Sequence, residues 1–174
     1  MAREIELKIR LTSPGAFQER LAQRARRIGP YHKADTYFSG PAGSFRLREA
    51  GSEATVCRKE KVVEAGIEVS RETEFAVDRP QAFRAFAEGL GYREWYRKEK
   101  RGTAWRWDDI LVEEGTVQGL GWFAEFEILL EDSADALAVD QARQTLLKAL
   151  ASLEVPRECL EPKTYAELLG HRGT

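Results

Sequence analysis

The chain of 174 residues is poor in the side chains that build disulfide frameworks and zinc centres. It holds two cysteines, Cys57 and Cys159, and two histidines, His32 and His171. So small a set favours a reduced, cytoplasmic protein and argues against a zinc site or a disulfide-stapled fold. No apolar run reaches membrane-spanning length and no hydrophobic segment follows Met1. We therefore expect neither a membrane partner nor a secretory signal.

The chain also has little net charge. Its 27 lysines and arginines nearly balance 29 aspartates and glutamates, for a net charge of −2. This balance gives no support for a nucleic-acid partner. Charged residues still make up 32% of the chain and hydrophobic residues 43%, so the pattern of charge is more informative than its total. The length, with no linker or repeat, predicts one domain over residues 1–174.

The spacing of apolar residues predicts an α+β protein with a mainly antiparallel sheet. The first expected helix covers residues 14–28, with Ser13 as N-cap and Gly29 as the residue that ends it. The second covers residues 79–90 and is capped by Asp78, and the third covers residues 133–152. A short helix that Pro162 opens follows near the end of the chain. Expected strands cover residues 3–11, 34–39, 44–50, 53–61, 67–77, 92–101, 103–107, 110–115 and 122–131. A sheet of eight or nine strands often closes into a barrel, which removes its edges.

The first strand separates charge from apolar surface. Side chains alternate faces along a strand, so Glu4, Glu6 and Lys8 share one face, and Ile5, Leu7 and Ile9 share the other. A second acidic pair, Glu125 and Glu127, lies on one face of a late strand. Two acidic strands at opposite ends of the chain indicate the wall of a charged cavity.

Basic pairs occupy strands between these two. Arg46 and Arg48 share one face, as do Lys98 and Lys100, and Lys59 lies on an alternating strand. Any single pair is most simply a solvated surface. If the apolar faces pack against helices outside a barrel, however, the charged faces point inward, and buried charge must be paired with water, metal ions or a polyanion. Arginine forks and lysines bind phosphate oxygens, whereas clustered carboxylates hold Mg²⁺ or Mn²⁺.

These residues resemble the CYTH superfamily, also called triphosphate tunnel metalloenzymes. The resemblance begins with the Glu-x-Glu-x-Lys signature at Glu4, Glu6 and Lys8 and covers most of the chain. Its other parts are Asp35-Thr36-Tyr37-Phe38, Phe45-Arg46-Leu47-Arg48, Ser70-Arg71-Glu72-Thr73-Glu74, Lys98-x-Lys100, Gly119 to Glu127, and Lys163-Thr164-Tyr165-Ala166-Glu167-Leu168-Leu169.

Two departures from the family pattern leave assignments open. Cys57 stands where the family has the threonine of Thr-x-Lys, so the basic residue of that strand is Arg58, Lys59 or Lys61. The family's Leu-Asp is replaced by Leu111-Val112-Glu113-Glu114, so Glu113 or Glu114 takes the place of a metal-binding aspartate.

The resemblance implies an eight-stranded antiparallel closed β-barrel with charged inner walls and helices outside. An acidic wall would bind one or two Mg²⁺ or Mn²⁺ ions through Glu4, Glu6, Glu113, Glu125 and Glu127, with Glu72 and Glu74 as further candidates. A basic wall would grip a triphosphate through Arg46, Arg48, Lys59, Lys98 and Lys100. Lys8 would contact phosphate between the walls and act in catalysis with Glu4 and Glu6, and Lys163 is a further candidate. Each of these residues could instead form an ion pair that only holds the walls together.

Three functions remain open at this point. The first, which we favour because it needs only the triphosphate site, is a metal-dependent triphosphatase acting on inorganic triphosphate or an organic triphosphate. The second, a class IV adenylyl cyclase, keeps the site but uses the ribose 3′-hydroxyl of ATP as nucleophile, releasing pyrophosphate. The third is a polyphosphate- or nucleotide-binding module without turnover, against which the two intact acidic pairs argue. The partner would be a small triphosphate, and a homodimer is one candidate assembly.

Overall fold

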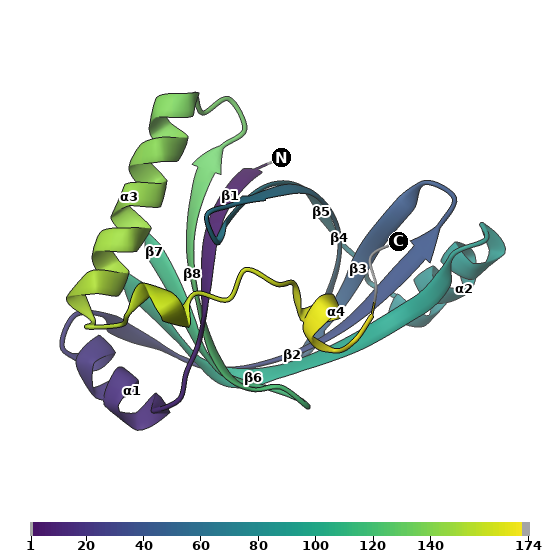
Figure 1. Cartoon of the computed structure of the whole chain (residues 1–174). Coiled ribbons are helices and arrows are strands. Elements are labelled where there is room, and N and C mark those ends of the chain that lie inside the picture. The colour runs from purple at the N-terminus through teal and green to yellow at the C-terminus, as the bar shows by residue number, and fades with distance from the viewer. Residues whose placement is uncertain (1, 172–174) are drawn as a thin grey trace.

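A computed structural model describes residues 2–171, which form a closed antiparallel barrel of eight strands with helices outside, as the sequence predicts (Figure 1). The strands are β1 (Ala2–Arg10), β2 (Arg26–Gly40), β3 (Gly43–Ala50), β4 (Glu53–Glu64), β5 (Ile67–Ala76), β6 (Arg93–Trp107), β7 (Ile110–Val117) and β8 (Gly121–Glu131). The helices are α1 (Pro14–Ala22), α2 (Pro80–Gly89), α3 (Ala136–Ser152) and α4 (Tyr165–Leu168), with a 3₁₀ turn at Arg157–Cys159. Around the barrel the strand order is β1-β5-β4-β3-β2-β6-β7-β8, and β8 closes on β1.

The main hydrophobic core lies outside the barrel wall. Ile5, Leu7 and Ile9 on the outer face of β1 are fully buried beneath α1 and α3. Phe17 of α1 and Leu146 of α3 belong to the same cluster. Burying side chains of this size contributes roughly 1.5–3 kcal/mol each. Because the apolar faces are used on the outside, the polar faces of the same strands form the barrel interior.

Two further helices, α2 and α4, pack against other parts of the barrel. α2 covers a second cluster that contains Phe38 and Leu47, on the side away from α3. The C-terminal segment runs across one end of the barrel, where α4 lies in Figure 1, and Tyr165 packs with Val117 and Phe123. Among residues 2–171 no helix combines the length and apolar character that crossing a bilayer would need.

The expected first helix is too long. It ends at Ala22, and Arg26 already pairs with Arg106 as the first residue of β2. Ile28, expected on the apolar stripe of the helix, is 51% exposed. It falls where the β2–β6 register shifts between Arg27 and Gly29, as the extra residue of a bulge. Pairing with β6 therefore overrides the helical spacing of this segment.

The boundary that we expected at Gly102 is also wrong, because β6 runs unbroken from Arg93 to Trp107. Gly102 pairs with Gly115 of β7, and the two backbones approach closely. A Cβ atom on Gly102 would lie 1.9 Å from the carbonyl oxygen of Glu114. This glycine permits a close contact between strands rather than a turn.

Ser13 is the N-cap of α1 as expected, although it makes no side-chain capping bond, whereas the other three helices begin later than predicted, α3 at Ala136 rather than at residue 133. Arg79, not Asp78, is the N-cap of α2, and it makes no side-chain capping bond, since Pro80 presets the first turn. α4 begins after Thr164 rather than at Pro162, because Thr164 and Glu167 form a reciprocal capping box. Asp135 caps α3 through the Ala138 amide.

We predict that Gly102→Ala destabilises the fold by about 1–3 kcal/mol, because the added methyl group collides with backbone that cannot move independently. Urea unfolding measures the effect. Gly15→Ala in α1 is the matched control, since a Cβ atom there meets no other atom within 4 Å. Equal stability of Gly102→Ala and Gly15→Ala would contradict the close approach of β6 and β7.

Candidate active site in the barrel interior

The strand register brings the predicted acidic residues to one inner wall. Glu4, Glu6 and Lys8 face inward from β1, where Glu6 is directly opposite Glu127 of β8 and Lys8 is opposite Glu125. On the next strand, Glu113 pairs with Glu125. Five carboxylates distant in sequence thus share adjacent strands: Glu4, Glu6, Glu113, Glu125 and Glu127.

These carboxylates crowd one another where water is scarce. Burial, reinforced by Glu6 and Glu127 against the attraction of Lys59, raises the pKa of Glu4 to about 9. Burial and the neighbouring Glu6 raise the pKa of Glu127 to about 7. The pKa of Glu6 is raised by burial and by Glu125. A hard divalent cation would relieve this repulsion, although in the described residues no three of the five carboxylates have ligand oxygens within 4.8 Å of one another.

Lys59, expected in the basic wall, lies among carboxylates of β1 and β5. Its Nζ atom lies 2.5 Å from Glu4, 2.6 Å from Glu72 and 3.7 Å from Glu68. These carboxylates outweigh burial and hold the pKa of Lys59 well above its usual range. Of the three candidates on this strand, Arg58 is exposed on the outer face with Glu60, and Lys61 is an exposed partner of Glu68. Geometry favours Lys59 as the inward cation.

A second cluster forms the basic wall around Asp35. Arg48 donates two hydrogen bonds to the Asp35 carboxylate, at 2.7 and 2.9 Å, and Lys98 lies 3.1 Å from the same group. Burial alone would raise the pKa of Asp35, but Lys98 and Arg48 outweigh it and hold that pKa below its usual range. Asp35 is 2% exposed, so this carboxylate holds two phosphate-binding candidates in the interior.

The two walls are joined through lysines. Lys100 contacts Glu125 and lies 3.6 Å from Glu113, and Lys33 also contacts Glu113. Burial opposes the charge of Lys100, but Glu125 and Glu113 raise its pKa above the usual value. At the far side, Arg46 is 3.2 Å from Glu74. The interior is therefore an ion-pair network in which predicted phosphate-binding cations contact predicted metal-binding carboxylates.

The choice between Glu113 and Glu114 follows from the pleat of β7. Glu113 faces the interior, whereas Glu114 points into the outer core and is 1% exposed. There it accepts hydrogen bonds from Gln18 at 2.9 Å and from the Trp105 indole at 3.5 Å. Burial raises the pKa of Glu114, although the hydrogen bonds from Gln18 and Trp105 act to lower it. Glu113 is thus the carboxylate that can replace the family's aspartate.

Lys8 has different surroundings from the other interior lysines. In the described part of the chain it is in no ion pair; its ammonium donates to the carbonyl oxygen of Lys163 and lies 4.3 Å from the centre of the Tyr165 ring. Burial lowers its pKa, although Glu6 opposes the shift. Lys163 contributes this carbonyl oxygen, while the residue itself is exposed.

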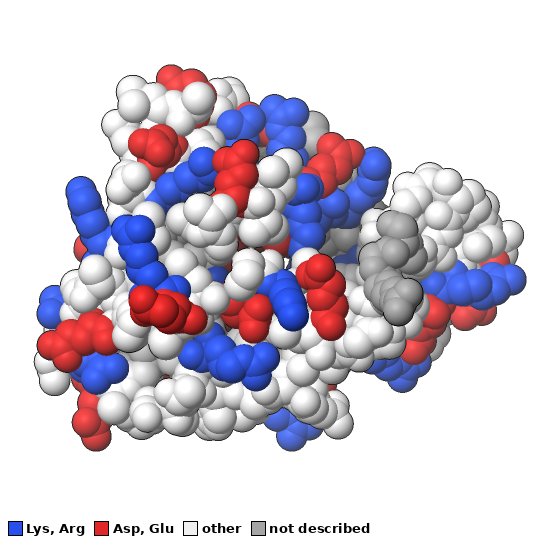
Figure 2. All heavy atoms as spheres, viewed as in Figure 1, with Lys and Arg blue, Asp and Glu red and all other residues white. Residues whose placement is uncertain are grey.

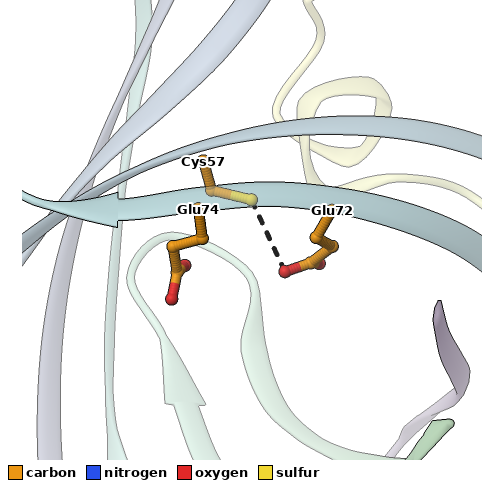
Figure 3. Close-up of side chains that lie close together, drawn as sticks. All are labelled: Cys57, Glu72 and Glu74. Carbon is orange, nitrogen blue, oxygen red and sulfur yellow. Dashed lines mark hydrogen bonds between the residues drawn. The ribbon is translucent and has the colours of Figure 1, made fainter. Parts of the chain in front are cut away.

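Cys57 lies close to the two acidic candidates of β5. Ligand atoms of Cys57, Glu72 and Glu74 lie within 4.8 Å of one another, the only such group found among residues 2–171 (Figure 3). The thiol is 3.5 Å from Glu72, and burial raises its pKa to about 12. Because Lys59 and Arg46 already neutralise Glu72 and Glu74, this group is part of the ion-pair network.

The face of the molecule shown in Figure 2 carries no comparable separation of charge. Basic and acidic side chains are interspersed there around the end of the barrel. Such a mixture gives no extended field of one sign for a large charged partner.

Three interior residues have roles that the sequence analysis did not assign. Lys33 and Asp35 continue the alternation that ends at Tyr37, and this period of two could have identified both. Tyr165 begins α4 in the C-terminal segment and contacts Lys8 and Lys98 through its ring face. The sequence analysis included this tyrosine in the family's C-terminal motif, but only the fold shows that it reaches the barrel interior.

Comparison with known proteins identifies the family of the chain. A family model described as the CYTH domain matches residues 2–165, so the chain belongs to the CYTH family. A Methanocaldococcus jannaschii protein named as a candidate adenylate cyclase is 23% identical, over 96% of this chain and 98% of that one.

Solved structures share the fold. A Pyrococcus horikoshii protein superposes with a TM-score of 0.82 at 22% identity, covering 95% of this chain and 98% of that one. A Hippeastrum protein, described as a candidate adenylyl cyclase with a dominant triphosphatase activity, has a TM-score of 0.62 at 16% identity, covering 99% and 97% of the two chains.

We predict that Asp35→Asn destabilises the protein by about 3–5 kcal/mol at pH 7, because it leaves two buried cations without their partner. Urea unfolding measures this loss. The surface variant Glu94→Gln, which breaks an exposed pair with Arg97, should change stability by less than about 0.5 kcal/mol.

Unfolding of wild type and Asp35→Asn at several pH values tests the sign of the pH dependence. Because the folded-state pKa of Asp35 is lower than its unfolded value of about 3.9, its contribution is complete above that pH and is lost as the pH falls further. The difference between wild type and Asp35→Asn should therefore shrink below about pH 4. A difference that grows in acid would contradict the arrangement.

Proposed function

We propose that this protein is a divalent-metal-dependent triphosphatase that binds inorganic triphosphate or an organic triphosphate inside the barrel. The proposal rests on one observation: a wall of crowded carboxylates and a wall of cations face each other inside the barrel. Lys98 and Lys100 are 7% and 4% exposed, which is rare for lysines unless they are paired. A triphosphate and its metal ion supply both walls with partners of opposite charge.

The carboxylates Glu4, Glu6, Glu113, Glu125 and Glu127 would hold Mg²⁺ or Mn²⁺. When bound, such an ion neutralises phosphate charge and activates water. Arg48 and Lys98 would exchange part of their contact with Asp35 for phosphate oxygens, and so orient the chain of phosphates and stabilise the charge that develops on it. Lys8, with its lowered pKa and without a carboxylate partner among the described residues, is suited to donate a proton to the leaving phosphate.

In the hydrolysis of inorganic triphosphate, a bond forms between the water oxygen and the terminal phosphorus. The bond from that phosphorus to the bridging oxygen breaks, and orthophosphate and pyrophosphate leave. The walls orient this attack, the attacking water gives up one proton to the solvent, and Lys8 supplies one proton to the bridging oxygen that leaves with pyrophosphate.

A second candidate is cyclisation of ATP, which the name of the M. jannaschii relative favours. The two reactions share the site and differ in the attacking oxygen and in the phosphorus attacked. Phosphorus NMR of the products distinguishes them. Hydrolysis predicts orthophosphate, whereas cyclisation predicts cyclic AMP and pyrophosphate from ATP. If the protein binds inorganic triphosphate and ATP but forms no metal-dependent product from either, both reactions are contradicted and a binding module is favoured.

We predict that Glu113→Gln lowers kcat at least about 100-fold in the presence of Mg²⁺ or Mn²⁺, because it replaces an inward charged carboxylate by a neutral amide, which binds a divalent cation more weakly. Metal-dependent phosphate release measures the loss. Its neighbour provides the matched control, since Glu114→Gln changes a carboxylate that faces the outer core and should retain activity close to wild type. Equal loss in both variants, with both folded, would contradict the assignment of Glu113 to the site.

A further inference from the structure

An aromatic stack begins where the basic wall ends. The inward face of β6 carries Tyr96, Lys98 and Lys100 in turn, and Tyr37 of β2 is directly opposite Tyr96. The two tyrosine rings stack with centroids 4.2 Å apart and planes 7° from parallel. Lys98 donates to the Tyr37 hydroxyl at 3.3 Å, so the stack is one contact from the candidate phosphate-binding groups.

A flat heteroaromatic ring already lies on this stack. The imidazole of His171 stacks on Tyr96 with centroids 5.2 Å apart and an interplanar angle of 24°. Trp95 forms a wall at right angles, with its ring 4.8 Å from Tyr96 at 88° and 6.3 Å from His171 at 72°. The His171 amide is bonded to Ala166, but among residues 2–171 its imidazole has no hydrogen bond or ion pair. Ring contacts alone hold the imidazole there.

We propose that Tyr37, Tyr96 and Trp95 form a stacking subsite for the planar heteroaromatic ring of an organic triphosphate, whose place His171 takes in the free protein. The inference rests on the proposed function, because it requires the triphosphate to lie along Arg48, Lys98 and Lys100. A triphosphate on these cations has its organic end at Tyr37 and Tyr96. Aromatic faces bind any flat ring, so the ligand class is a heteroaromatic triphosphate rather than one particular base.

The opposite end of the same wall offers no equivalent. Tyr31 lies 5.3 Å from Lys33 and 5.8 Å from Lys100 as a cation–π partner. Within the described residues it stacks on no other ring. The stack thus gives the cationic wall a direction, with the organic group at the Tyr96 end.

The test is calorimetric titration of the full-length protein with ATP and with methyl triphosphate, a matched ligand without a ring. EDTA in the buffer prevents turnover by either reaction. Wild type should bind ATP more tightly than methyl triphosphate. Tyr96→Leu should weaken ATP binding about tenfold and leave methyl triphosphate unchanged, whereas Tyr96→Phe should retain the preference.

His171→Ala makes the test independent of the fold of the Tyr96 variant. Freed of its competing imidazole, the stack should bind ATP about threefold more tightly, with methyl triphosphate unchanged. His32→Ala, at an exposed histidine on β2, is the control and should change neither affinity.

Each remaining result counts against one proposal or the other. Equal binding of the two ligands by wild type, or equal effects of Tyr96→Leu and His171→Ala on both, would overturn the subsite and make the stack an anchor for the C-terminal segment. Failure of both triphosphates to bind in EDTA and also in the presence of Mg²⁺ would overturn the proposed function as well.

Discussion

A buried charge is stable only beside an opposite charge, and this constraint shapes the whole barrel interior. Asp35 shows it most clearly, because this almost fully buried carboxylate neutralises both Arg48 and Lys98. Lys59 does the same among Glu4, Glu72 and Glu68. The network keeps cations and carboxylates in place without a ligand, and its members are those that a metal ion and a triphosphate would bind. Binding therefore exchanges one set of charge partners for another, which lowers the cost of keeping so many charges out of water.

The outer architecture follows from the same constraint. Since each strand devotes one face to charge, its other face carries the hydrophobic core, and α1 and α3 supply the apolar partners. The closed sheet leaves no unpaired edge beside the charged interior. In β1, for example, Ile5 and Leu7 contribute to the outer core, while Glu4 and Glu6 line the candidate site. A shift of one residue in the register of this strand would therefore turn the apolar side chains inward and the carboxylates outward.

The alternation of side chains made much of this structure predictable. It placed the Glu4-Glu6-Lys8 face inside, and the barrel follows from the number of strands. Prediction failed where tertiary contacts override local pattern, as at Ile28, which has helical spacing but lies in a bulge of β2. It failed also at Gly102, which allows close strand contact. The choice between Glu113 and Glu114 needed the register of β7, and the stack of His171 on Tyr96 joins segments 75 positions apart in the printed sequence, where no local signal exists.

On this view, a bound triphosphate replaces the internal partners of the basic wall. The decisive experiment is a crystal structure with Mg²⁺ and the slowly hydrolysed analogue imidotriphosphate. We expect the analogue inside the barrel, with Arg48 and Lys98 in contact with its phosphate oxygens and metal density beside Glu6, Glu113 and Glu127. An analogue bound only on the outer surface, with the contacts of Asp35 unchanged and no metal among these carboxylates, would contradict it.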